Sequence, residues 1–277
     1  MNTAPVENAN IDRALEAEAA AGSPLVSVIM PLHNAEPYIA ETLASVLTQT
    51  YGNWELIVVD DCSTDASCSI VETALERDER IRLLRNPGNM GVAKTRNRGV
   101  LEARGRYVAF LDADDAWMPE KLGRQIAFMA ESGCAMCFTS YETIESDGSH
   151  RNYVRVPREI GYGGFLKNTV TCSHTIMFDL SKTERSLLVC PDFDGCFDFP
   201  EDMVVWLQVL KSGVIAQGLD EVLAKNRKHD ASRSADKRRA VLRTWNAYRQ
   251  VEYLALPYAA YCLFWQLFHA VLKRIRR

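Results

Sequence analysis

The stretch that decides the fold is LVSVIMPLHNAEPYIAETLASVLTQTYGNWELIVVDDCSTDAS, residues 25–67. Two short apolar runs in it, 25–31 and 54–60, are rich in β-branched residues and predict buried strands. Between them Pro37 suits a first helical turn, and apolar residues at helical spacing predict a helix that packs on the strands. Strand, helix and strand at this spacing predict a βαβ unit with parallel strands.

The same alternation continues toward the middle of the chain. Further strands are predicted at 80–85, 106–112 and 134–140, with helices after DCSTD, over 91–104 and from Pro119. Apolar, non-alternating strands predict an α/β fold whose central sheet is mostly parallel and carries helices on both faces. The polar, Gly-rich stretch 145–170 predicts loops, with GYGG (161–164) as a flexible one; 171–178 is compatible with a strand, and 201–211 predicts a helix after Pro200.

Composition excludes several classes of protein. The chain has 277 residues, of which 47% are hydrophobic and 25% charged, as in an ordinary globular protein. Its net charge of −4 argues against nucleic acid as a partner. The charge is uneven, because residues 225–277 hold thirteen basic and three acidic side chains. Residues 1–22 lack the basic and apolar stretches of a signal peptide and predict a flexible leader. We therefore expect a cytoplasmic protein whose eight cysteines, Cys134 and Cys137 included, are free thiols.

Polar and acidic side chains follow three of the predicted strands, where ligands bind in open α/β sheets. They are Pro31, His33 and Asn34 after the first strand, Asp60 and Asp61 after the second, and Asp112, Asp114 and Asp115 after the fourth. Carboxylates gathered at one edge repel each other, so a positive partner is expected, and Mn²⁺ or Mg²⁺ prefers such oxygen ligands. Two other roles stay open: acidic pairs also form turns and helix caps, and Asp60 or Asp61 could accept hydrogen bonds from a pyrimidine or a ribose.

Other nucleotide-binding classes lack their motifs here. No GxGxxG follows the first strand, and GxxxxGK[ST] does not occur, which disfavours a Rossmann dehydrogenase and a P-loop NTPase. A nucleotidyltransferase on a related sheet would need a loop rich in Gly, Arg and Lys where PLHNAEP (31–37) stands.

Four segments, in order over roughly residues 24–232, resemble an inverting family-2 glycosyltransferase with the GT-A fold. They are residues 27–67, NMGVAKTRNRGVLEARGRYVAFLDADDAWMP (89–119), FPEDMVVWLQVL (199–210) and KNRKHDASRS (225–234). The resemblance implies that a nucleotide-diphosphate sugar, a UDP-sugar, donates its sugar with inversion and with a divalent metal. The acceptor it implies is a glycan or lipid-linked saccharide in polysaccharide, lipopolysaccharide or exopolysaccharide biosynthesis.

The resemblance also implies roles for single residues. The nucleotide-sugar-binding residues would be Pro31, His33, Asn34, Asp60, Asp61, Lys94, Arg96, Asp112 and Asp115. The metal ligands would be Asp112, Asp114 and His229, although which of Asp114 and Asp115 meets the metal is left open. Asp202 would be the catalytic base, and its place in a first helical turn predicts a low pKa. The alternative is a non-catalytic nucleotide-sugar-binding subunit of a glycan assembly complex.

The C-terminal part predicts a different surface. The proposed division is a leader (1–22), a catalytic domain (23–232) with a nucleotide-binding half (23–116) and an acceptor half (117–232), and a helical tail (233–277). Residues 253–272 carry no charge and precede KRIRR, but Pro257 and a polar stripe at 266, 269, 273 and 276 favour an interfacial helix over a membrane span. We therefore expect a peripheral enzyme at the inner face of the cell membrane, bound to an anionic surface through 253–277. Packing against protein and spanning the membrane stay open as alternatives.

Overall fold

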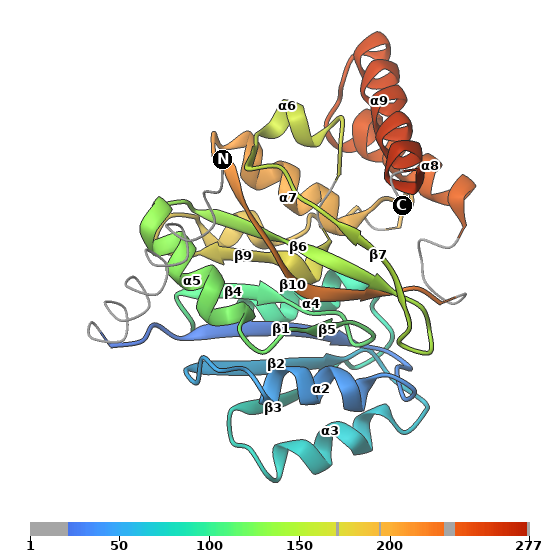
Figure 1. Cartoon of the computed structure of the whole chain (residues 1–277). Helices are drawn as coiled ribbons and strands as arrows, with labels where there is room; N and C mark the ends of the chain where they lie inside the picture. The colour runs from blue at the N-terminus through green and yellow to red at the C-terminus, as the bar shows by residue number, and fades with distance from the viewer. Residues whose placement is uncertain (1–21, 170–171, 194, 230–235, 276–277) are drawn as a thin grey trace.

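A computed structural model describes residues 22–169, 172–193, 195–229 and 236–275 (Figure 1). Nearly all of the predicted leader, and the predicted boundary between residues 232 and 233, lie outside the described residues. The sheet follows the order β3-β2-β1-β4-β9-β6-β10-β5, with β7 on β6 and β8 on β10.

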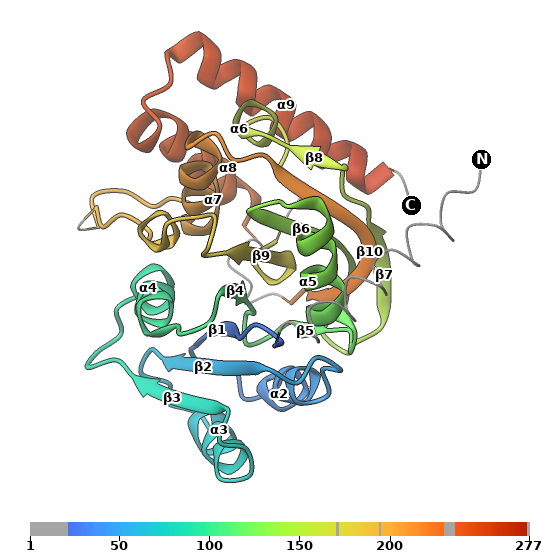
Figure 2. The ribbon, with the colours of Figure 1, turned by 90° about the vertical axis from the view of Figure 1, so that its left-hand side faces the viewer.

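The N-terminal half is the predicted βαβ series. Its elements are β1 (Val26–Leu32), α2 (Ile39–Leu47), β2 (Trp54–Asp60), α3 (Ser67–Leu75), β3 (Ile81–Arg85), α4 (Val92–Glu102) and β4 (Tyr107–Phe110). All pairings within β3-β2-β1-β4 are parallel. Figure 2 shows α4 on one side of β1 and β2 and α2 on the other, and the two faces bury separate hydrophobic clusters. The predicted α/β fold with helices on both faces is confirmed.

The second half extends this sheet with mixed pairing. It comprises β5 (Ala116–Trp117), α5 (Lys121–Ser132), β6 (Met136–Ile144), β7 (His150–Val154), β8 (Glu159–Ile160), α6 (Tyr162–Phe165), β9 (Ile176–Asp179), α7 (Glu201–Lys211) and β10 (Ala216–Arg227), with 3₁₀ turns at Ser173–Thr175 and Arg185–Leu188. β9 is antiparallel to both β4 and β6, whereas β10 is parallel to β6. The parallel part of the sheet is therefore its N-terminal half together with the β6–β10 pair.

Two sequence expectations for this half are wrong. The stretch 145–170 contains β7, β8 and α6, and most of GYGG is helical instead of a flexible loop. The strand β10 was not predicted, because its polar sequence AQGLDEVLAKNR shows no strand periodicity and its pairing with β6 has irregularities near Val222. Backbone pairing to β6, β5 and β8 defines this strand where its own side chains do not.

The C-terminal helices pack on the rest of the described chain at the end of the molecule opposite β3 (Figures 1 and 2). They are α8 (Lys237–Asn246), a π-helical turn (Ala247–Val251) and α9 (Leu256–Ile275). Tyr248, Ala259 and Cys262 are fully buried in the same cluster as α4 and α7. Within the described part of the chain, no helix has both the length and the apolar character needed to cross a membrane.

Candidate active site

The loops after β1 and β2 are joined to each other by Asn34. Its backbone has a φ of 49°, a left-handed conformation that asparagine tolerates better than most residues. The Asn34 side chain accepts a hydrogen bond from the backbone of Thr64 at 2.8 Å, and its own backbone N–H donates to Ser63 at 3.1 Å. Next to it, Nδ1 of His33 lies 2.9 Å from the backbone oxygen of Asp61. The predicted nucleotide-binding residues Pro31, His33 and Asn34 thus lie together at one end of the sheet.

Asp60 and Asp61, in contrast, are buried and hold loops. Asp60 accepts a hydrogen bond from the backbone three residues further on at 3.0 Å, which is the turn that the sequence left open. Asp61 accepts from the backbone of Met90 and Gly91 at 2.7 and 2.8 Å and from Asn86 at 2.9 Å. Burial opposes its ionisation, but these hydrogen bonds outweigh burial and lower the pKa of Asp61. Its carboxylate therefore holds the loop before α4.

The three acids after β4 separate into two environments. Asp115 is 3% exposed, lies 2.7 Å from Nδ1 of His174 and accepts a hydrogen bond from the backbone of Arg227 at 2.8 Å. The side chains of Asp112 and Asp114 are 30% and 31% exposed. The expectation that Asp115 contacts the nucleotide does not fit this position, because its carboxylate is turned into the protein. Asp112 and Asp114 are the acids that face outward.

Asp114 meets the end of β10. Its Oδ2 lies 2.8 Å from Nε2 of His229, whose ring is 5.1 Å from that of Tyr38. Burial and the neighbouring charges of Asp115 and Asp112 raise the pKa of Asp114 to about 6. Burial and the two neighbouring acids therefore disfavour the ionised form of this carboxylate.

Arg227 is a site residue that the sequence reasoning did not single out. Arg227 is buried, and its backbone N–H donates to Asp115 as described above. Its Nε donates to the backbone oxygen of Asp114 at 3.0 Å, and its Nη2 lies 2.6 Å from the carboxylate of Glu41 on α2. Arg227 thus connects the end of β10 to Asp114 and Asp115 by hydrogen bonds. Its only sequence signal was its place two residues before His229, as the arginine of the quoted R-x-H-x-x-S segment.

Arg96 on α4 joins the acids of the sheet to those of α7. Its guanidinium contacts Asp112, and its Nη1 lies 3.0 Å from Oε1 of Glu201. Burial opposes its charge, yet these acids outweigh burial and raise the pKa of Arg96. Lys94, predicted beside it at the nucleotide, lies 2.7 Å from Asp192 in an exposed ion pair.

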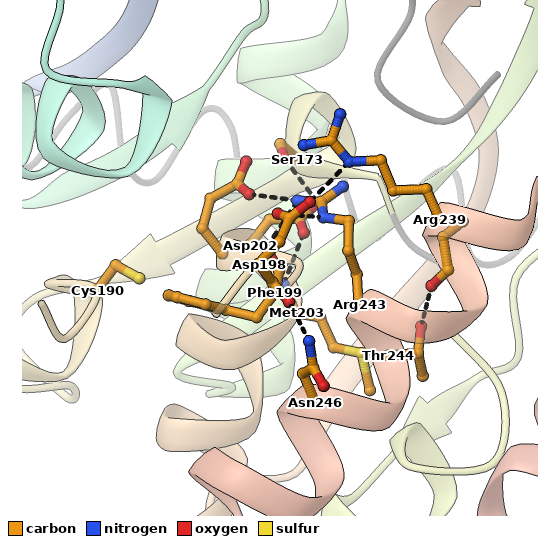
Figure 3. A network of polar contacts seen from close by, with 12 residues as sticks. Ser173, Cys190, Asp198, Phe199, Asp202, Met203, Arg239, Arg243, Thr244 and Asn246 are labelled. Carbon is orange, nitrogen blue, oxygen red and sulfur yellow. Dashed lines mark hydrogen bonds and ion pairs between the residues drawn. The ribbon is translucent and has the colours of Figure 1, made fainter. Parts of the chain in front are cut away.

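Asp202 lies in the first turn of α7, beside this bridge. Its two oxygens accept hydrogen bonds from the backbone of Met203 at 2.7 Å and from Ser173 at 3.3 Å (Figure 3). Burial and the charge of Glu201 raise the pKa of Asp202, although Arg96 works against them. The low pKa expected from the helix N-terminus is therefore wrong, because that expectation left out burial and the neighbouring acid.

The donors at this site fit a divalent cation. Asp112 and Asp114 offer carboxylate oxygens, and His229 offers an imidazole. Among the described residues, no three His, Cys, Asp or Glu side chains are already arranged to hold a metal.

Comparison with known proteins finds relatives of one family. The sequence model of the family described as "Glycosyl transferase family 2" matches residues 27–183. A Bacillus subtilis protein named for teichuronic acid biosynthesis, the glycosyltransferase TuaG, is 40% identical over 91% of this chain and 98% of its own length. The Escherichia coli UDP-Glc:α-D-GlcNAc-diphosphoundecaprenol β-1,3-glucosyltransferase WfgD is 37% identical over 80% of this chain and 84% of its own.

Solved structures share the fold. Staphylococcus aureus TarS 1–349 in complex with UDP-GlcNAc aligns with a TM-score of 0.67 and 23% identity, over 82% of this chain and 65% of TarS. The mannosyltransferase PcManGT from Pyrobaculum calidifontis, in complex with GDP-Man and Mn²⁺, aligns with a TM-score of 0.63 and 20% identity, over 95% and 78% of the two chains. At these identities the likeness shows the fold, which is the GT-A fold that the sequence predicted.

Proposed function

Because the chain belongs to glycosyl transferase family 2, we propose that it transfers a sugar from a UDP-sugar to a lipid-diphosphate-linked saccharide, with inversion, during surface polysaccharide assembly. The name of WfgD supports this choice, since it states a UDP-Glc donor, a GlcNAc-diphosphoundecaprenol acceptor and a β-1,3 product. Single displacement on an α-linked nucleotide sugar yields a β linkage. The UDP-GlcNAc bound to TarS supports a uridine donor.

The observation that carries the proposal is the bridge from Asp112 through Arg96 to Glu201. It connects the end of the sheet, where the nucleotide diphosphate would bind, to the first turn of α7, where Asp202 lies. A transferase needs its leaving group and its base on opposite sides of one anomeric carbon. Asp202, half-buried and held by two hydrogen bonds, supports a transferase over a protein that only binds nucleotide sugars.

On the donor side, Asp112, Asp114 and His229 would hold a divalent cation together with the diphosphate. Such a cation, when bound, stabilises the negative charge that grows on the leaving phosphate. Arg96 supports the same charge, and its buried Nε has no hydrogen-bond partner among the described residues. His33 and Asn34 would contact the base, while Asp61 keeps the loop before α4 closed.

On the acceptor side, Asp202 would take the proton of the attacking hydroxyl at a carboxylate oxygen. Its raised pKa makes it a stronger base than an ordinary aspartate. The hydrogen bonds from Met203 and Ser173 keep both of its oxygens in one orientation.

The tail supports attachment to a membrane surface. Apolar side chains on α9 point away from the protein, with exposed fractions of 42% to 62%: Leu256, Tyr258, Tyr261, Phe264, Leu267, Phe268 and Val271. Gln266, the first residue of the polar stripe, donates a hydrogen bond to Thr169 at 2.8 Å. An exposed apolar helix face followed by the basic residues KRIRR suits the cytoplasmic leaflet of an anionic membrane.

The proposed function is tested with UDP-glucose, UDP-GlcNAc and UDP-galactose as donors and GlcNAc-diphosphoundecaprenol in detergent as acceptor, with and without Mn²⁺. We expect UDP release and a lengthened glycolipid with one donor, and a β linkage by NMR. Binding of UDP-sugars by calorimetry without transfer to this acceptor, or without release of UDP, would favour the non-catalytic subunit. An α-linked product would contradict inversion.

A further inference from the structure

The helix α8 forms hydrogen bonds with residues 198–199, which lead into α7. Arg243 of α8 is 9% exposed, and its guanidinium donates to the side chain of Asp198 at 2.9 Å and to the backbone oxygen of Phe199 at 2.7 Å (Figure 3). Asn246 donates to the backbone oxygen of Asp198 at 2.8 Å. Three hydrogen bonds from one helix therefore fix the residues that immediately precede the first turn of α7.

Arg243 also reaches the acid beside Asp202. Its Nη2 lies 3.0 Å from Oε2 of Glu201, while Arg96 lies 3.0 Å from Oε1 of the same carboxylate. Glu201 is buried, so each of its oxygens has a guanidinium partner where water is largely excluded. A buried carboxylate that lost one of these partners would turn toward another cation or toward water, and the helical turn that carries it would shift.

We propose that Arg243 is a positioning residue for the transfer reaction, and that it holds Glu201 and the first turn of α7 so that Asp202 faces the acceptor. The C-terminal helices would then complete the active site as well as attach the protein to a surface. This inference rests on the proposed function, because it takes Asp202 as the base.

The position of α8 is itself held by the packing that follows it. Tyr248, in the turn after α8, donates a hydrogen bond to the backbone oxygen of Leu166, and Ala259 and Cys262 on α9 are fully buried. Arg243 therefore extends from a rigid support, and its planar fork can bind Glu201, Asp198 and Phe199 at once. A lysine would supply the charge but not the fork.

The test compares Arg243→Met and Arg243→Lys with Arg239→Met. Arg239 is the matched control, because it lies on the same helix and pairs with Asp198 but is 67% exposed. With the donor and acceptor given above, we expect Arg243→Met to lower kcat by about 10- to 100-fold and to leave the KM for the donor nearly unchanged. This is the loss of rate expected when a catalytic base is displaced by about 1 Å. Arg243→Lys should recover part of kcat, and Arg239→Met should keep wild-type kcat. Wild-type kcat in Arg243→Met, or an equal loss in Arg239→Met, would overturn the inference.

A double-mutant cycle with Glu201→Gln separates positioning from general destabilisation. If Arg243 acts through Glu201, the double variant should lose no more kcat than the worse single variant; multiplied losses would contradict the proposal. Amide hydrogen exchange over residues 198–206 reports on the first turns of α7 without any turnover. We expect faster exchange in Arg243→Met than in Arg239→Met, and equal exchange in the two variants would also overturn the role of Arg243. Asp202→Asn is measured in parallel: full activity there removes the base assignment, whereas an inactive Asp202→Asn beside a fully active Arg243→Met overturns only the role of Arg243.

Discussion

The two sides of the candidate active site are built in different ways. On the nucleotide side, Asp61 is held by the loop that enters the neighbouring helix, through hydrogen bonds to Met90 and Gly91. On the acceptor side, Glu201 is held by Arg96, 105 positions away in the chain, and by Arg243, 42 positions away. Hydrogen bonds from a loop lower the pKa of Asp61, whereas burial beside another acid raises the pKa of Asp202. The same residue type is thus a structural anion on one side and a candidate base on the other.

The largest expected effect is on the acceptor side. Asp202→Asn should lower kcat by roughly 10²- to 10⁴-fold, the usual contribution of a general base, because the amide cannot take the proton of the acceptor. Affinity for UDP in the presence of Mn²⁺ should stay near wild type, as measured by calorimetry. Asp192→Asn is the control, since Asp192 forms an exposed pair with Lys94. Wild-type turnover in Asp202→Asn would remove the functional contrast between the two sides.

The next effect concerns the donor side. Asp114→Ala should weaken UDP binding by about 10- to 100-fold when Mn²⁺ is present, the range seen when metal-site groups are removed, and much less when a chelator is present. Asp147→Ala, in an exposed turn, serves as the control. Equal affinities with and without metal in the wild-type protein would contradict a metal site at Asp112, Asp114 and His229.

A third prediction uses the opposite pKa shifts of two carboxylates in metal-free protein. The pKa of Asp61 is lowered, so the stability it contributes is present above its unfolded pKa of 3.8 and is lost as pH falls. The pKa of Asp114 is raised to about 6, so its contribution is greatest below pH 3.8 and is lost as pH rises toward 6. Thermal unfolding at pH 4 and pH 7 should therefore show that Asp61→Asn destabilises more at pH 7.

At pH 7 the same measurement should show Asp114→Asn raising Tm by roughly 2–4 °C, the shift that about 1 kcal/mol produces in a protein of this size. The gain should shrink at pH 4, where Asp114 is largely protonated in the wild type. If both variants shifted Tm in the same direction at pH 7, the contrast between the two environments would fail.

The smallest effect is expected on the outward side of the C-terminal helices. Phe264→Ser with Phe268→Ser should lower binding to phosphatidylglycerol vesicles several-fold at low salt, because each change removes apolar area from a helix face open to solvent. Tyr153→Ser is the control, since Tyr153 is an exposed aromatic residue on β7, outside the proposed membrane-binding segment. Unchanged sedimentation with vesicles would contradict attachment through α9.

Sequence reasoning succeeded where the information is local. Apolar runs of strand length predicted β1 and β2 to within a residue, and the stretch after Pro200 predicted α7. It failed for β10, whose polar sequence is a strand through its backbone pairing with β6, β5 and β8. It also could not separate Asp114 from Asp115, because adjacent residues in a turn differ only in what they meet: His174 and the backbone of Arg227 draw Asp115 inward.

The sequence by itself determined the order of strands and helices in the N-terminal half, the acids at the strand ends and the resemblance to a family, because periodicity and short motifs depend on neighbours in the chain. The tertiary structure decided which acids are exposed, which are paired and how strongly each holds its proton. Those properties depend on burial and on partners such as Arg96 and Arg243, which are distant in the chain. The sign of the Asp202 shift follows from that environment: a helix N-terminus alone lowers the pKa of an acid, but burial next to Glu201 raises it.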